Sequence, residues 1–98
     1  MKRVLLSRRA ESDLAAILSH IAGDSPRQAV IVTDRLEAAA MDLADTWAHY
    51  PRVDLARYPD VRRRTVGSYN LFYLVEDDDV YVLHIVHGSR DIESLFSS

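Results

Sequence analysis

A chain of 98 residues is long enough for one hydrophobic core and short for two, so we expect a single domain over residues 1–98. Its composition is 48% hydrophobic and 28% charged, as in folded globular proteins, and the lack of Cys excludes disulfides, thiolate metal sites and cysteine nucleophiles. A formal net charge of −3 gives no general attraction to nucleic acid. No apolar run could cross a bilayer or form a signal peptide, so we expect a cytoplasmic protein without membrane contact.

The chain begins with the pattern of a short strand followed by a helix. Residues 3–6 are β-prone, and Ser7 is a suitable N-cap for the helix that follows. Gly23 stands where helix C-termini commonly place a glycine in the left-handed conformation. The apolar residues that recur with helical spacing in this helix are Ala10, Leu14, Ile17, Leu18 and Ile21.

A second helix is predicted to begin after Ser25, which forms a capping-box pattern with Gln28. It should stop before Pro51, because a residue that precedes proline avoids the helical conformation. Its predicted buried face consists of Val32, Leu36, Ala39, Leu43 and Trp47. The two helices therefore predict an αα-hairpin over residues 8 to about 49, with Trp47 anchoring it against a sheet.

Residues 52–60 are predicted to form a loop, because their apolar residues follow neither helical nor strand spacing. The residues after this loop predict an antiparallel meander. Its strands are Val61–Val66, Tyr69–Glu76 and Val80–His87. In the last of these strands the side chains expected on both faces are apolar, apart from the histidines. We therefore expect a central strand that is covered on both faces. Residues 91–96 could form one helical turn that closes over the sheet. The predicted fold class is α+β, in the order β-α-α-β-β-β, with a helical hairpin packed on a small antiparallel sheet and a short C-terminal helical segment.

Positive charge is concentrated in residues 52–64, which contain five arginines and two aspartates. On a strand, Arg62 and Arg64 share one face and Arg63 takes the other. Arginine suits bidentate contact with carboxylates and phosphates, so we predict that these three arginines contact a target or a partner. The alternative is a solvated, charged face without a binding role.

Five local patterns, in this order and at these separations, resemble the ParE/RelE superfamily of toxins. They are LSRRAESDL at 6–14, SP at 25–26, RRR at 62–64, GSYNLFYLVED at 67–77 and VLHIVHGSRD at 82–91. The ParE branch is the closer match, because its members resemble this chain in the apolar Tyr-x-Leu-Phe-Tyr strand and in the final His-x-x-Arg-Asp segment.

This resemblance implies the toxin of a type II toxin–antitoxin module. ParE-like toxins bind DNA gyrase and leave it stalled on cleaved DNA without being enzymes, whereas RelE-like toxins cut mRNA in the ribosomal A site. Both are neutralised by an antitoxin, ParD-like or similar, whose disordered tail folds over the toxin. We favour gyrase, because a net charge of −3 opposes docking into ribosomal RNA. A ribosome-dependent mRNA endonuclease and a degenerate, non-toxic binding module are the alternatives.

RNA cleavage of the RelE kind needs a basic platform, an Arg to stabilise the phosphorane-like state, and a general acid or base. The candidate residues for that chemistry are Arg62, Arg64, Tyr69, His84, His87 and Arg90. This platform is thin, because Ser68 and Asn70 stand where family members often place a basic residue. We expect Arg64 and Arg90 to be at least partly exposed, since an unpaired buried guanidinium would be too costly.

Several of these residues also have structural interpretations. Tyr69 suits sheet packing, and His87 with Arg90 could fix the C-terminal segment to the sheet. His84 and His87 are three residues apart on a strand and point to opposite faces, so they cannot share a metal without a bulge. We therefore expect neither a metal site nor a cofactor.

The exposed side of the predicted hairpin carries apolar residues that lie off the buried Leu36 stripe. Ile31, Ala38 and Met41 are the clearest of them. We therefore predict that the hairpin and the sheet form a groove for the antitoxin tail, with Ile31 and Met41 in contact with it.

Overall fold

The computed structural model describes residues 1–88 and 92–96 of the chain. Its elements in chain order are β1 (Arg3–Leu6), α1 (Arg8–Ala22), α2 (Pro26–Thr46), the 3-10 helix η1 (Trp47–His49), β2 (Arg62–Val66), β3 (Tyr69–Glu76), β4 (Asp79–His87) and α3 (Ile92–Leu95). The predicted α+β order is confirmed. None of the helices in the described ranges is both long and apolar enough to span a membrane.

The four strands form one sheet in the order β1-β4-β3-β2, so β4 is a central strand, as predicted. The pairings β2–β3 and β3–β4 are antiparallel, which confirms the meander. β1 lies parallel to β4, from Arg3 opposite Asp79 to Leu6 opposite Val82, so the sheet is mixed rather than wholly antiparallel. The sequence pattern of a single edge strand does not show its direction, and for this reason the parallel pairing was not predicted.

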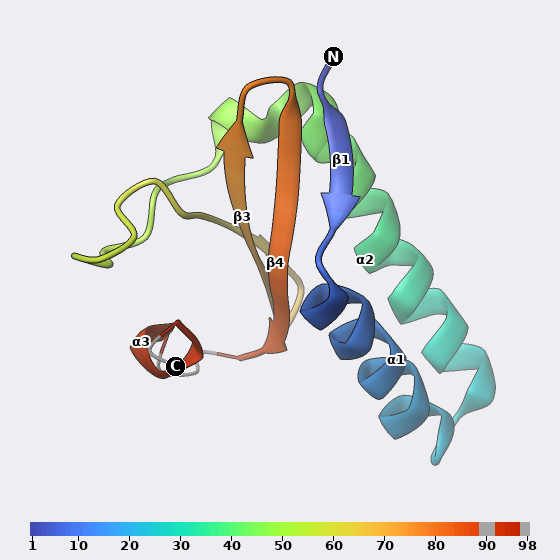
Figure 1. The fold of residues 1–98 in the computed structure, drawn as a ribbon. Coiled ribbons are helices and arrows are strands. Elements are labelled where there is room, and N and C mark those ends of the chain that lie inside the picture. Colours follow the sequence, from blue (N-terminus) through green and yellow to red (C-terminus); the bar gives the residue numbers. More distant parts are fainter. Residues whose placement is uncertain (89–91, 97–98) are drawn as a thin grey trace.

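The sheet has two faces with different covers (Figure 1). The α1–α2 hairpin covers one face, which we call the hairpin face. The loop at residues 51–61 and α3 lie on the other side, which we call the open face. Position in this layered arrangement decides what each candidate side chain can contact.

The buried core of the hairpin face joins both helices to the three strands β1, β4 and β3. Its buried members are Ala10, Leu14, Leu36, Ala39, Ala40, Leu43, Leu71, Tyr73, Val80, Val82 and Ile85. The predicted second-helix stripe is thus confirmed at Leu36, Ala39 and Leu43. Trp47 packs against this core but is half-buried, and the large aromatic at its centre is Tyr73, which is 0% exposed.

The turn between the two helices differs in detail from its sequence pattern. Ser7 caps α1 as predicted, accepting the Ala10 N–H at 2.9 Å. Gly23 has φ −58°, so the predicted left-handed conformation is wrong there. The chain keeps helical geometry because the amide groups of Asp24 and Ser25 both donate to the Ile21 carbonyl, at 3.0 and 2.8 Å.

The start of α2 shows one half of the predicted capping box. The Ser25 hydroxyl accepts the Gln28 N–H at 3.2 Å. The reciprocal bond is replaced, because the Ser25 N–H already donates to the carbonyl of Ile21. At its other end α2 stops at Thr46 and continues as η1, before Pro51 as predicted.

A second, smaller core lies on the open face, and the loop contributes to it. Its buried members are Val53, Leu55, Val61, Phe72 and Val86. Leu83, Leu95 and Phe96 pack against it, which confirms that the C-terminal turn closes over the sheet. Both faces of β4 are therefore covered along part of its length.

Candidate functional site

The three arginines of β2 alternate between the two faces, as their spacing predicts. Arg62 and Arg64 lie on the hairpin face, where each contacts the end of the helical region. Arg63 is exposed, and its backbone N–H donates to the Pro51 carbonyl at 3.0 Å; within the described part of the chain its side chain has no bonded partner. The arginines therefore differ in what they can offer to another molecule.

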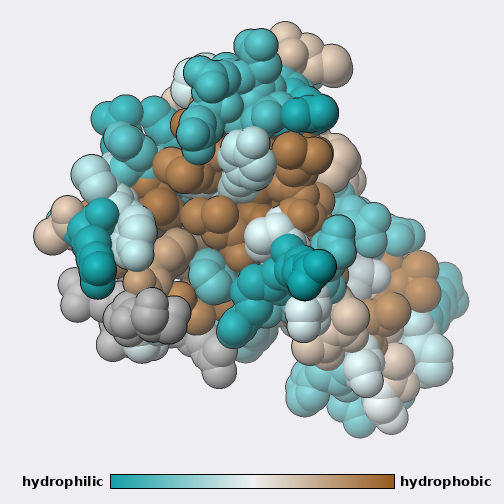
Figure 2. All heavy atoms as spheres, viewed as in Figure 1, coloured by the Kyte–Doolittle hydropathy of each residue, from teal (hydrophilic) through white to brown (hydrophobic). Residues whose placement is uncertain are grey.

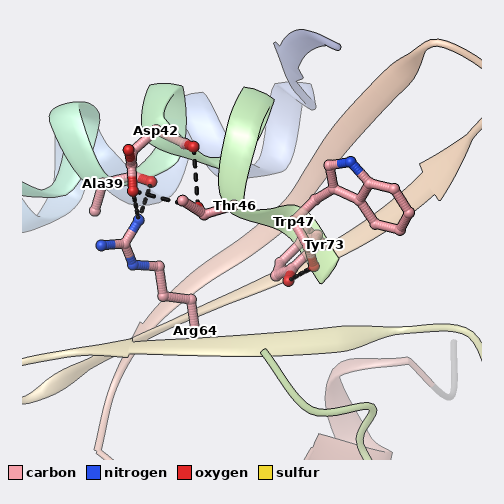
Figure 3. Close-up of polar contacts among 6 residues, drawn as sticks. All are labelled: Ala39, Asp42, Thr46, Trp47, Arg64 and Tyr73. Atoms are coloured by element: carbon pink, nitrogen blue, oxygen red, sulfur yellow. Dashed lines mark hydrogen bonds and ion pairs between the residues drawn. The ribbon is translucent and has the colours of Figure 1, made fainter. Parts of the chain in front are cut away.

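Arg64 connects β2 to the C-terminal part of α2 (Figure 3). Its Nη1 donates to the Ala39 carbonyl at 2.8 Å and to Oδ2 of Asp42 at 2.9 Å. The guanidinium also lies 4.9 Å from the centre of the Tyr50 ring, within reach of a cation–π contact. Its side chain is 20% exposed, so it is partly exposed as predicted, but its polar atoms hold the fold together.

Arg62 makes a similar set of contacts one step along the strand. Its Nη1 donates to the Tyr50 carbonyl at 2.6 Å, and its guanidinium lies 5.8 Å from the centre of the Trp47 ring. Lys2 approaches the same ring, with Nζ 5.0 Å from the ring centre. Trp47 is thus flanked by two cations, which supports its predicted role as an anchor of the hairpin.

Tyr73 completes this junction beneath the end of α2 (Figure 3). Its hydroxyl donates to the Trp47 carbonyl at 2.6 Å. Burial raises the pKa of Tyr73 to about 12, with the neighbouring arginines 62 and 64 opposing that rise. The phenol is neutral and serves as a structural donor.

A groove runs between α2 and the edge strand β2. One part of it has a volume of about 530 Å³ and is lined by Arg35, Ala38, Asp42, Arg64 and Gly67, among others. A second part of about 210 Å³ follows, lined by Val32, Leu36, Val66, Ser68 and Tyr69, and it shares Arg35, Val66 and Gly67 with the first. We call these two parts together the α2–β2 groove.

Ile31 and Met41, two exposed apolar residues of α2, do not line this groove. Ile31 and Met41 are 49% and 47% exposed, and Ala38 lines the groove itself.

Gly67 in the β2–β3 turn has φ +59°, a conformation that a glycine adopts readily. The nearest neighbour of a Cβ added there would be Nη1 of Arg35 at 3.9 Å.

The two candidate histidines lie on opposite faces of β4, as predicted. His87 is on the hairpin face, where its ring meets that of Tyr69 edge-on at 5.1 Å; both line a pocket of about 480 Å³ with Ile17 and His20. His84 is on the open face, against Phe96 at 4.8 Å between ring centres. Burial lowers the pKa of His84; Asp13 opposes this shift and Arg9 adds to it.

The six residues considered for RNA cleavage therefore do not meet at one place. Arg62, Arg64, Tyr69 and His87 belong to the hairpin face, and His84 belongs to the open face. Arg90 lies outside the described residues. Within residues 1–88 and 92–96, no group of three or more His, Asp or Glu side chains could hold a metal ion.

Two features of this region have no clear signal in the sequence. Arg35 is one of several charged residues on an amphipathic helix, and only the position of the β2–β3 turn places it in the α2–β2 groove. Asp13 is a charged residue of an amphipathic helix, where a solvent-facing side chain is the usual expectation. In the structure its Oδ2 accepts the N–H of Ile85 in β4 at 3.0 Å.

Comparisons with known proteins agree with this architecture. Residues 4–92 match the family model of the ParE toxin of the type II toxin–antitoxin system parDE. The chain therefore belongs to the ParE toxin family, and it is a toxin-type component of a type II toxin–antitoxin system. No curated protein matches the sequence.

Solved structures share the fold at low sequence identity. A chain of the chromosomal ParDE system of Pseudomonas aeruginosa has a TM-score of 0.79 at 20% identity, over 91% of this chain and 98% of that one. A chain of the toxin–antitoxin complex RelBE2 of Mycobacterium tuberculosis has a TM-score of 0.64 at 21% sequence identity, over 88% of this chain and 96% of that one. The isolated Escherichia coli RelE toxin has a TM-score of 0.60 at 18% sequence identity, over 99% of this chain and 96% of that one.

Proposed function

We propose that this ParE-family toxin poisons DNA gyrase and that a cognate antitoxin neutralises it by binding the α2–β2 groove. The observation that carries the choice of target is the engagement of the β2 arginines. Nη1 of Arg62 donates to Tyr50, and Nη1 of Arg64 donates to Ala39 and Asp42, so both guanidinium groups are held within the fold. They are poorly placed to serve as a phosphate-binding platform for RNA.

Charge supports the same choice. The chain has a net charge of −3, and RNA binding depends on releasing counterions through many Lys and Arg contacts. Binding to a protein target makes no such demand. Among the RNA-cleavage candidates, His84 also lies on the face away from the arginines.

Inducible expression of the chain in a bacterial host, with reporters for DNA damage and for translation, tests the target. We expect induction of the DNA-damage response and filamentation while bulk translation continues at first. A purified-protein assay should show gyrase trapped on cleaved DNA. Prompt translation arrest with A-site mRNA cuts would replace this target with the ribosome, and the absence of both effects would indicate a non-toxic binding module.

The α2–β2 groove has the chemistry to bind an acidic, hydrophobic peptide. Its wall includes the apolar residues Val32, Leu36 and Val66. Its rim carries the exposed Arg35, which can pair with a carboxylate of the peptide. β2 is the last strand of the sheet, so its outer edge could also accept an extended segment beyond the part bonded to Pro51.

Hydrogen exchange with and without the antitoxin tests this groove. We expect added protection in α2 and in β2, and unchanged protection across residues 8–49 would contradict the proposal. Arg35→Ala should weaken antitoxin binding by about fivefold or more, as expected for an interface Arg. Arg27→Ala is the matched control, because Arg27 is an exposed arginine of the same helix that does not line the groove.

A further inference from the structure

The open face of the sheet contains a pocket that has no part in the proposed toxin function. The pocket has a volume of about 630 Å³, well inside the range of small-molecule sites. It lies between the start of α1, the loop at residues 57–61, β4 and the C-terminal turn. Figure 2 shows hydrophobic surface over the middle of the molecule, bordered by polar groups.

A β-bulge aims His84 into this pocket. Phe72 pairs with His84 and Tyr73 pairs with Val82, so Leu83 is an extra residue on β4. The bulge breaks the strict alternation of side chains, and consequently two consecutive residues, Leu83 and His84, both line the pocket. An unbroken strand would turn one of them towards the hairpin.

The start of α1 holds the bulge in place. The Ser7 hydroxyl donates to the Leu83 carbonyl at 2.9 Å, and the Ile85 N–H donates to Oδ2 of Asp13 at 3.0 Å. The other carboxylate oxygen of Asp13 pairs with Nε of Arg9 at 3.0 Å. The position of His84 is therefore built by side chains from another element and does not result from local disorder.

His84 has an unmet hydrogen-bonding capacity in this position. Its Nδ1 is buried and has no hydrogen-bond partner in the described part of the chain. A buried polar atom without a partner is costly, and such atoms are rare in folded proteins. Because this atom is buried, a ligand in the open pocket does not reach it, and the cost falls on the fold itself.

The walls of the pocket define what the ligand must be. Tyr58 and Phe96 present rings 5.5 Å apart, and Phe96 also meets the imidazole of His84, which favours a flat, apolar body. Arg9 and the exposed Arg57 bring two positive charges to the lining, against one carboxylate, that of Asp60. We propose that this pocket binds a small aromatic carboxylate, with its ring against Tyr58 and Phe96 and its carboxylate against the side chains of Arg9 and Arg57.

NMR titration of the full ¹⁵N-labelled chain with phenylacetate tests the proposal, and 2-phenylethanol serves as the uncharged probe of the same shape. We expect saturable binding of phenylacetate in roughly the millimolar range, as is usual for a ligand of this size. The shifted amides should belong to residues 57–61 and 83–85. 2-Phenylethanol should bind the same residues about tenfold more weakly, because it lacks the charge-assisted bond.

A variant and its control test the charged part of the site. Arg57→Ala removes an exposed charge without touching the core and should weaken phenylacetate binding by about three- to tenfold. Arg8→Ala is the matched control, because Arg8 is exposed beside the site without lining it. No saturable shift, shifts scattered over the surface, or equal affinity for both probes would overturn the proposal. So would unchanged affinity in Arg57→Ala, a variant whose folding can be verified by its unaltered spectrum.

Discussion

The two faces of the sheet differ in how completely their polar groups are satisfied. On the hairpin face, the hydroxyl of Tyr73 and the guanidinium of Arg64 both have partners at the end of α2. On the open face, Nδ1 of His84 is buried without a partner among residues 1–88 and 92–96. The hairpin face therefore satisfies these polar groups, whereas the open face leaves a buried polar atom unsatisfied at some cost to stability.

The size of the two cores should give the largest difference between the faces. Leu43 is fully buried under the hairpin, and Leu43→Ala should lower the free energy of unfolding by about 2 to 5 kcal/mol, from lost burial plus a cavity. Val61 is 2% exposed in the open-face core, and Val61→Ala removes two carbon atoms at about 0.8 kcal/mol each. Urea unfolding of both variants measures the difference. Equal losses would show that the two cores contribute alike.

Removing a single buried hydroxyl should give the next largest effect. Tyr73→Phe leaves the Trp47 carbonyl without its 2.6 Å donor and should cost roughly 1 to 2 kcal/mol. Because the folded-state pKa of Tyr73 is raised from 10.0 to about 12, its stabilisation is complete below pH 10 and is lost as pH rises towards 12. The free energy of unfolding should therefore decline more steeply between pH 8 and pH 11 in the parent chain than in Tyr73→Phe. Parallel curves would refute the role of the Tyr73 hydroxyl as a buried, neutral donor.

Neighbouring arginines of β2 provide a matched test across the two faces. Arg64→Ala breaks the bonds to Ala39 and Asp42 and should cost about 1 kcal/mol, or a fall of roughly 4 to 8 °C in melting temperature. Arg63→Ala, on the exposed side, should change stability by no more than about 0.5 kcal/mol. If Arg64→Ala melts like the parent chain but loses toxicity, Arg64 contacts the target and the structural role described here is wrong.

Periodicity predicted the elements of this fold well. The spacing of apolar residues located α1 and the buried stripe at Leu36, Ala39 and Leu43, and the bounds of β3 were predicted to the residue. These features depend on neighbours close in sequence, and alternation or helical spacing reports them directly. The parallel direction of β1 depends on a partner 76 positions away, between Arg3 and Asp79, and no local pattern encodes it.

The candidate sites were predicted less completely, for a related reason. The alternation of Arg62, Arg63 and Arg64 was correct, but their contacts depend on where α2 ends above the strand. The bulge at Leu83 and His84 is likewise invisible in the sequence, because it is held by Ser7 and Asp13 from α1. Side-chain chemistry can be read from the sequence, whereas the pairing of distant groups requires the fold.

His84 gives the smallest predicted effect and the most direct test of the open face. Burial lowers the folded-state pKa of His84 below its ordinary value of 6.5, so the unfolded chain binds the proton more readily than the folded chain. The stabilisation from the neutral imidazole is thus complete above about pH 6.5 and is lost as pH falls through the lower, folded-state pKa. Asp13 and Arg9, the charged groups that face the ring, act in opposite directions on this shift.

The free energy of unfolding should therefore decrease more steeply from pH 7 to pH 5 in the parent chain than in His84→Phe. Identical slopes in the parent chain and in His84→Phe would mean that the imidazole is solvated when folded, and the contrast between a satisfied hairpin face and an unsatisfied open face would then have to be given up.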